Sequence, residues 1–250
     1  EANGLSNKKR KALIQELTAT AIAYIQGDFL AETTSRLQAL LTSEPWSLEP
    51  DPNDRQTLLF AYPPSLDLIA YGDTAYIPPS VRLELGARSD HSPAVVRSVT
   101  SMATEEFPDA ADLAPVDVPM LAAERTFWEK VTLLHAEAWR ERSRADARAM
   151  SRHLYDVKRL AESEYGEKAI DDDALLERVV AHKLLYFSSP QSRYDLCVRG
   201  SLRLLPLEPE ALKRLELDYR DMQVMFLAEP PPFGELIGGL RKLEATLNRI

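Results

Sequence analysis

The stretch from Glu124 to Leu160, ERTFWEKVTLLHAEAWRERSRADARAMSRHLYDVKRL, decides how the rest of the chain is interpreted. Its first half repeats apolar residues at the spacing of one helical face, which predicts an amphipathic helix over residues 126–141 packed on a core. These apolar residues are Phe127, Val131, Leu134 and Ala138. Lys130 lies among them, either as a functional cation or as a lysine whose ammonium group reaches water along its apolar stem.

A second helix is predicted to begin near Ser151, whose side chain suits the N-cap position. His153 and Asp156 lie three residues apart on this helix and are therefore neighbours on its surface. The alternative to a functional role is an ordinary surface ion pair of Asp156 with Arg152 or Arg159, which would be worth less than ~1 kcal/mol.

Together the two segments form the pattern R-T-F-x-E-K-x-x-x-L-H followed by R-H-x-Y-D-x-x-x-L, which resembles the AbiEii/AbiGii nucleotidyltransferase toxin family. In that family the lysine after the glutamate and the aspartate of the R-H/D-x-Y-D helix are active-site residues, so the resemblance assigns catalytic roles to Lys130 and Asp156. Lys130 would neutralise triphosphate charge, and Asp156 would orient the acceptor or act as a base. The C-terminal stretch at 215–248 also resembles the family, so the likeness runs from about residue 6 to the end of the chain.

The composition of the 250 residues, 45% apolar and 28% charged, is typical of a globular protein with a sizeable core. The net charge of −9 argues against a protein that coats nucleic acid, although it leaves room for a local basic patch. The single cysteine, Cys197, cannot form an internal disulfide, and no apolar run approaches the ~20 residues of a membrane span, so we expect a cytoplasmic protein. With only nine glycines, the chain carries neither a P-loop nor a dinucleotide-binding motif.

The N-terminal segment predicts a helix over residues 6–25, capped by Ser6, and another over 28–41. The start of the first helix carries four consecutive cations, whose charges oppose the helix dipole. These cations are Lys8, Lys9, Arg10 and Lys11. They either contact phosphate, which makes them the candidate nucleotide-binding residues, or form a solvated basic end.

The following segment has the residue types of β-strands. The predicted strands cover residues 46–48, 57–62 and 76–86, with a turn at 51–54 between the first two. In the third strand Arg82 and Glu84 alternate with apolar residues and share one face. Polymerase-β-like nucleotidyltransferases place a third metal-binding carboxylate on a later strand of the sheet, which makes Glu84 the candidate metal ligand. A solvent-facing glutamate on a half-exposed strand is the alternative.

Residues 91–114 are predicted to be irregular, with at most a short helix at 102–107. Further along, Arg144, Arg148 and Arg152 would form a basic ridge if their segment is helical, either as a track for RNA phosphates or as part of a salt-bridged solvent face. Three more helices are predicted over residues 173–187, 208–227 and 233–247.

The resembled family has an N-terminal Gly-Ser loop and a short D-x-D strand that hold the triphosphate and two divalent metal ions, and neither motif is found in this sequence. In the family the S-x-K-K-R-K segment follows the D-x-D strand directly, whereas here it begins at Ser6. We therefore expect the chain to be the downstream part of a longer protein and catalytically silent by itself, because phosphoryl transfer depends on the metal cage.

The sequence thus predicts an α+β protein, with a nucleotidyltransferase-like (polymerase-β-like) mixed sheet flanked by helices over residues 1–118 and a helical C-terminal domain over 119–250. The resemblance implies a toxin of the abortive-infection or toxin–antitoxin type that transfers a nucleotide from an NTP to an acceptor, with tRNA suggested by family members. It also implies Mg²⁺ as cofactor and a cognate antitoxin as partner, and no membrane partner is expected. Two alternatives stay open: a degenerate, non-catalytic member that binds nucleotide or antitoxin, and a helical interaction module in which Lys130 and Asp156 are structural.

Overall fold

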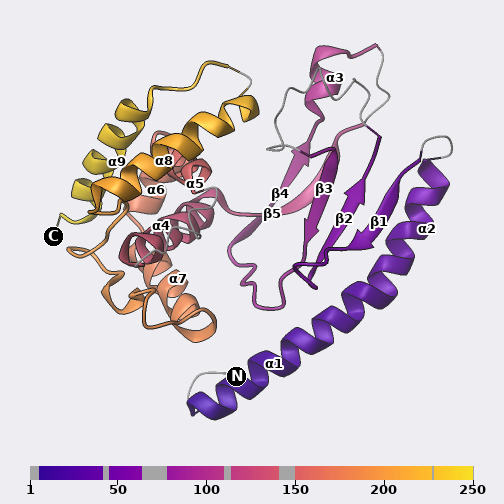
Figure 1. Ribbon diagram of the computed structural model, residues 1–250, viewed down its shortest axis with the longest axis horizontal. Coiled ribbons are helices and arrows are strands. Elements are labelled where there is room, and N and C mark those ends of the chain that lie inside the picture. The colour runs from indigo at the N-terminus through magenta and orange to yellow at the C-terminus, as the bar shows by residue number, and fades with distance from the viewer. Residues whose placement is uncertain are drawn as a thin grey trace. The chain divides into compact units, whose positions relative to one another are not determined.

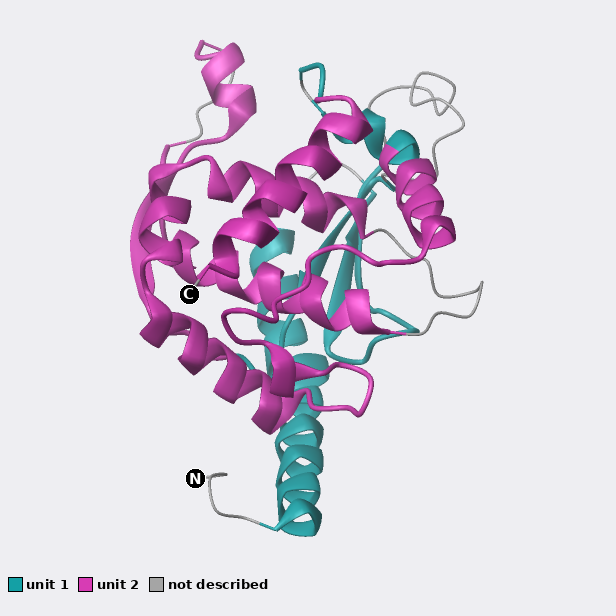
Figure 2. Cartoon of the chain, turned by 90° about the vertical axis from the view of Figure 1, so that its left-hand side faces the viewer, with its two compact units in different colours: residues 1–89, 220–230 teal, residues 90–219, 231–250 magenta. Residues whose placement is uncertain are grey.

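The computed structural model describes residues 6–41, 45–63, 78–109, 114–140, 150–226 and 228–249. The chain forms two compact units (Figure 2). Unit 1 contains Glu1–Ser89 and Arg220–Pro230, and unit 2 contains Asp90–Tyr219 and Pro231–Ile250. Helices and small antiparallel sheets occur together, which confirms the predicted α+β class. The predicted domain boundary at residue 118 falls inside unit 2 and stays a prediction.

Unit 1 begins with a long, uninterrupted helical segment made of α1 (Asn7–Tyr24), a π-helical turn η1 (Ile25–Phe29) and α2 (Leu30–Leu40) (Figure 1). Ser6 is the N-cap, as predicted, and its hydroxyl oxygen accepts a hydrogen bond from the Lys9 backbone N–H at 3.4 Å. The sequence indicated two helices, and the structure joins them through the π-helical turn without a loop.

A three-stranded antiparallel sheet completes unit 1, with the order β1–β2–β3. Its strands are β1 (Ser47–Pro50), β2 (Thr57–Ala61) and β3 (Ser80–Glu84). Leu48 and Leu58 are buried against Ile25 of the helical segment, so the helix covers one face of the sheet (Figure 1). The three predicted strands are confirmed over these bounds, and the predicted start of the third strand at 76 and 77 lies outside the described residues.

Unit 2 opens with a two-stranded antiparallel ribbon of β4 (Ala94–Val99) and β5 (Val116–Leu121), which flank the short helix α3 (Met102–Glu106). The helix confirms the prediction, but the expectation that residues 91–114 are otherwise irregular is wrong because β4 lies among them. The side chains of β4 are exposed along its whole length, so no buried face imposes the alternation by which strands are recognised. Pro119 lies within β5 opposite Val96, a residue that normally argues against a strand.

Helices form the rest of the chain. They are α4 (Ala123–Trp139), α5 (Ser151–Ala161), α6 (Glu164–Ile170), α7 (Asp173–Tyr186), η2 (Tyr194–Leu196), α8 (Pro209–Asp221), η3 (Met222–Met225) and α9 (Phe233–Leu247). Helix α4 packs against α5, α6 and α7, and its fully buried Trp128 donates an indole hydrogen bond of 2.9 Å to the carbonyl oxygen of Ala169. The predicted helical C-terminal part is therefore confirmed. No helix among the described residues is long and apolar enough to cross a bilayer.

The N-cap of α5 differs from the prediction. Met150 occupies that position, and Ser151 is the first helical residue and is fully buried. The Ser151 backbone N–H donates to a carboxylate oxygen of Asp218 at 2.7 Å, and its hydroxyl donates to the Leu215 carbonyl at 2.7 Å. A side chain from α8 thus binds the free N–H group that a local serine was expected to satisfy.

Candidate functional site

Helices α4 and α5 bring two of the predicted site residues into direct contact. The Lys130 Nζ donates to the Asp156 Oδ2 at 2.7 Å, although 26 positions separate the two residues in the chain. Their side chains retain 24% and 41% exposure respectively, so a ligand can reach both. The buried apolar residues of α4, including Phe127 and Val131, fix the helix on its core and leave Lys130 at the edge of that core.

His153 is a third member of this group. Its Nδ1 lies 3.4 Å from the Lys130 Nζ. Burial, together with the positive charges of Lys130 and Arg152, lowers the pKa of His153 to about 4. The imidazole is therefore neutral at pH 7 and can accept a hydrogen bond from the ammonium group. Lys130 is held between a carboxylate and a neutral ring nitrogen, both on α5.

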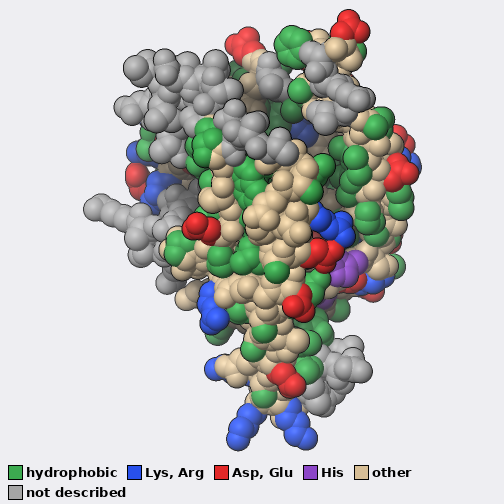
Figure 3. Space-filling model, turned by 90° about the vertical axis from the view of Figure 1, so that its right-hand side faces the viewer, with side chains coloured by type: hydrophobic (Ala, Val, Ile, Leu, Met, Phe, Trp, Pro, Cys, Tyr) green, Lys and Arg blue, Asp and Glu red, His purple; other side chains and the backbone are tan. Residues whose placement is uncertain are grey.

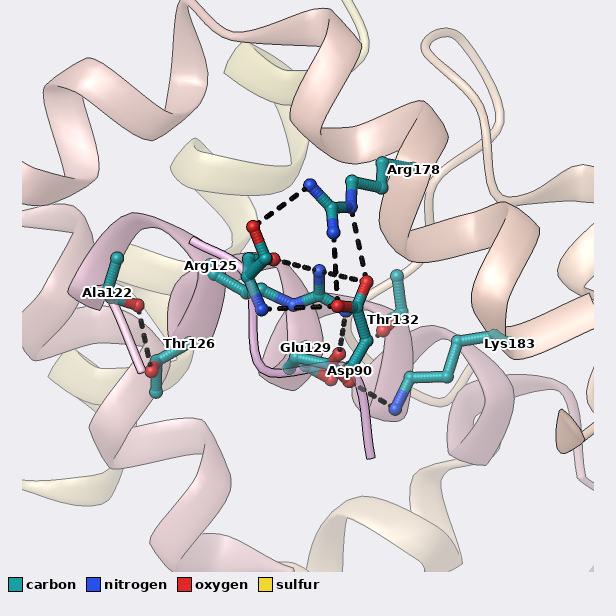
Figure 4. Close-up of polar contacts among 9 residues, drawn as sticks. Asp90, Ala122, Arg125, Thr126, Glu129, Thr132, Arg178 and Lys183 are labelled. Carbon is teal, nitrogen blue, oxygen red and sulfur yellow. Dashed lines mark hydrogen bonds and ion pairs between the residues drawn. The ribbon is translucent and has the colours of Figure 1, made fainter. Parts of the chain in front are cut away.

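An ion-pair network forms around the buried side chain of Arg125 on α4 (Figure 4). The side chain of Arg125 is fully buried and contacts Asp90 at 2.7 Å and Glu129 at 3.0 Å. Glu129 also pairs with Lys183, and Asp90 with Arg178, so the network ties α4 to α7 and to the segment before β4. It holds in place the helical turn that immediately precedes Lys130.

The charge on Glu129 follows from this network. Burial alone would raise the pKa of its carboxyl group, but the bonds from Lys183 and Arg125 outweigh burial and hold that pKa below its ordinary value. Sequence reasoning did not assign any role to Arg125. The available signal was the arginine four residues before Glu129 within R-T-F-x-E-K, a spacing that places the two side chains on one helical face.

His135, the last residue of the same sequence pattern, is also fully buried. The backbone N–H of Arg203 donates to its Nδ1 at 3.1 Å, so the proton resides on Nε2, which donates to the Arg193 carbonyl at 3.0 Å. Burial lowers the pKa of His135, which keeps it neutral. This histidine connects α4 to two later segments. No contact among the described residues links it to Lys130.

Glu84 belongs to unit 1 and is exposed on β3. Its carboxylate pairs with Arg82 at 3.1 Å, and Arg82 also bonds Asp51 at 2.7 Å. Arg82 and Glu84 therefore share one face of the strand, as predicted. Because Lys130 and Asp156 are in unit 2, the role of Glu84 at a common site stays a prediction.

The basic start of α1 is also in unit 1, and its cations gather at the N-terminal end of that helix (Figure 3). Lys8, Lys9 and Lys11 are exposed, Arg10 is half-buried, and no acidic residue is present in the first turn. The positive charges are thus accessible to an anion, and their assignment to nucleotide binding stays a prediction.

The arginines that follow α4 are only partly described by the structure. Arg140 pairs with Glu137 at 3.0 Å, whereas Arg142, Arg144 and Arg148 lie outside the described residues.

The described residues contain no group of three or more His, Cys, Asp or Glu side chains arranged to hold a metal ion. Asp156 is engaged by an ammonium group, and Glu84 by a guanidinium group. Mg²⁺ prefers an octahedral set of oxygen ligands, so these residues do not make a magnesium site by themselves.

A sequence model of a nucleotidyl transferase family matches residues 5–249 of the chain, which include Lys130, Asp156 and every described residue. The chain belongs to the AbiEii toxin family of type IV toxin–antitoxin systems. Membership implies a nucleotidyltransferase-like fold and a cognate antitoxin. No curated protein and no solved structure matches the chain significantly.

Proposed function

We propose that this AbiEii-family chain forms part of a nucleotidyltransferase toxin that acts in the cytoplasm and moves a nucleotide from an NTP to an acceptor, with tRNA as the acceptor that the resemblance suggests. Lys130 and Asp156 are its catalytic residues. The proposal rests chiefly on the 2.7 Å contact between these two side chains, which come from separate helices and stay partly exposed. Residues that act on one substrate have to converge in this way, whereas two unrelated surface residues do not.

The ammonium group of Lys130 carries three N–H donors. Two of them point to Asp156 and His153, so the third is available to a phosphate oxygen of the NTP. A lysine that neutralises charge developing on the triphosphate lowers the barrier to phosphoryl transfer mainly through electrostatics. Asp156 in turn orients the hydroxyl group of the acceptor or accepts its proton through its second oxygen.

We further propose that Lys8, Lys9 and Arg10 contact phosphate and that Glu84 supplies one carboxylate to the divalent ion that the resemblance implies. The described residues do not complete a cage for Mg²⁺, so no step is assigned to the ion. The exposure of Lys8, Lys9 and Glu84 supports these assignments, because each side chain is accessible to a charged ligand.

The proposal is tested by labelling total RNA and purified tRNA with each of the four NTPs in the presence of Mg²⁺. The enzyme is the natural gene product that contains this chain, as wild type, as Lys130→Ala, as Asp156→Asn and as the double variant. Each single change is expected to lower the rate by about 10² or more, because it removes a contact made in the transition state. The double variant is expected to lose much less than the product of the two losses, since both residues act in one site.

The matched control is the exposed pair of Lys168 and Glu164, which lie 2.8 Å apart on α6 of the same unit. Lys168→Ala and Glu164→Gln remove the same kinds of group and are expected to leave the rate within about twofold, because exposed ion pairs contribute little. Rates near wild type in Lys130→Ala or Asp156→Asn would show that the pair is structural. A gene product that binds NTP without transferring a nucleotide would favour the non-catalytic alternative.

A further inference from the structure

A cavity of about 430 Å³ lies within unit 2, between the end of α4, the start of α5, and α8 with the segment that precedes it. Four leucines form much of its apolar lining, and all four are buried: Leu134, Leu154, Leu204 and Leu215. Its volume is in the range of small-molecule sites, which are mostly apolar with a few polar groups that orient the ligand. Neither Lys130 nor Asp156 lines it, so it is separate from the pair described above.

The charged part of the lining holds three arginines and two glutamates, Glu137 and Glu208. Arg140, Arg203 and Arg214 all face the cavity, and only Arg140 forms an ion pair among the described residues, with Glu137. The Nε of Arg214 is buried and has no hydrogen-bond partner in the described part of the chain. Among the described residues, Arg203 and Arg214 thus form no ion pair, and the three arginines outnumber the two glutamates of the lining.

Trp139 adds an aromatic wall. The guanidinium carbon of Arg203 lies 3.6 Å from the centre of the Trp139 ring, a close cation–π stack. His135 fixes this arrangement, because its Nδ1 accepts the backbone N–H of Arg203. The indole Nε1 of Trp139 is buried without a hydrogen-bond acceptor among the described residues. The stack on the Trp139 ring thus holds the guanidinium group of Arg203 at the wall of the cavity.

We infer that this cavity binds a small organic anion, namely a carboxylate or a phosphate ester with an apolar body. Its charged oxygens accept hydrogen bonds from the guanidinium groups of Arg203 and Arg214, whose planar geometry suits carboxylates and phosphates. The apolar body of the ligand packs against the four leucines. A neutral apolar ligand would leave the guanidinium groups of Arg203 and Arg214 without an anionic partner. The inference does not depend on the proposed nucleotidyl transfer.

The test is a calorimetric titration of the purified chain with benzoate, phenyl phosphate, inorganic phosphate and the neutral analogue benzamide. Saturable binding of benzoate or phenyl phosphate is expected, and the stronger of the two identifies the anionic group. Arg203→Gln and Arg214→Gln are each expected to weaken this binding by about tenfold or more, because each removes a charge-assisted hydrogen bond. Trp139 emission is expected to change on binding, with Trp139→Phe identifying the signal among the three tryptophans.

Two control variants separate the cavity from its surroundings. Lys213→Gln removes an exposed cation next to Arg214 on α8 and is expected to leave the affinity unchanged. Lys130→Ala is also expected to retain binding, because Lys130 does not line the cavity. Four results would each overturn the inference: no saturable binding, an affinity insensitive to both arginine variants, inorganic phosphate or benzamide binding as tightly as the aromatic anions, or loss of binding in Lys130→Ala.

Discussion

Lys130 and Asp156 form a 2.7 Å ion pair between α4 and α5 that keeps both side chains partly exposed to solvent. A pair in this position contributes little to the stability of the fold, because water already screens the two charges. Mutation of the pair should therefore affect the stability of the protein and its activity to different extents.

For the Lys130–Asp156 pair we expect Lys130→Met and Asp156→Asn each to change the free energy of unfolding by less than ~1 kcal/mol, the range typical of exposed ion pairs. Urea unfolding followed by circular dichroism measures this change. Losses of several kcal/mol would instead show that the pair is a structural salt bridge. The proposed catalytic roles require mutations of the pair to lower activity strongly and stability only slightly.

Arg125 should behave in the opposite way. Its side chain is fully buried and bonds Asp90 and Glu129, so Arg125→Met leaves two carboxylates short of a partner. We expect a loss of about 3–5 kcal/mol in unfolding free energy, the usual cost of removing one partner of a buried ion pair and leaving the other charge uncompensated. The control Arg178→Met also removes a bond to Asp90, but from a half-exposed arginine, and should cost less than ~1 kcal/mol. Equal losses in the two variants would contradict the prediction.

His153 predicts a dependence of stability on pH. Its ordinary pKa of 6.5 falls to about 4 in the folded chain, so between these values the unfolded state binds a proton that the folded state does not. Stability is therefore complete above pH ~6.5 and decreases as the pH falls toward ~4. The cations Lys130 and Arg152 favour the neutral ring, whereas Asp156 and Asp218 oppose them weakly.

The measurement compares wild type with His153→Asn by urea unfolding at several pH values between 4 and 7. The variant should lose less stability than wild type on acidification, since it lacks the titrating group. His135 and His182 also have pKa values lowered by burial and stay in both proteins, so some pH dependence will remain. Identical pH profiles would show that His153 is not held neutral by the fold.

Gly166 near the start of α6 provides a packing prediction. A Cβ added there would lie 2.1 Å from the Leu160 carbonyl oxygen, so Gly166→Ala forces the backbone of two helices apart and should destabilise unit 2 by several kcal/mol. In contrast, nothing lies within 4 Å of a Cβ added at Gly238 in α9. Gly238→Ala should raise stability by roughly 0.5–1 kcal/mol through helix propensity. Thermal unfolding of the two variants checks both directions.

Cys197 should be chemically silent while the chain is folded. It is fully buried, and burial raises its pKa to about 12, so almost no thiolate exists at pH 8. We expect a disulfide reagent such as DTNB to label it only at the rate of unfolding, and full labelling to occur at once in urea. Rapid labelling under native conditions, or a disulfide-linked dimer needed for activity, would contradict this expectation.

The sequence by itself determined most of the helices, because their apolar residues repeat every three or four positions. The apolar residues of α4, such as Phe127 and Val131, are buried as the spacing predicts. The three-stranded sheet was also predicted, since turn residues and β-rich segments mark it locally. The ribbon of β4 and β5 was not, because its strands bury no face and gain their stability from pairing across about twenty residues.

The same distinction between local sequence and tertiary structure applies to the candidate site. Motif spacing selected Lys130 and Asp156 one at a time, but local sequence could not distinguish a convergent pair from two surface charges. Only the packing of α4 on α5 placed Nζ against Oδ2, and only the tertiary structure revealed how Arg125 reaches Asp90 and how His135 reaches Arg203. The physical reason is that helical periodicity is a property of neighbouring residues, whereas these bonds join residues that are 26 to 68 positions apart and meet only after the core has formed.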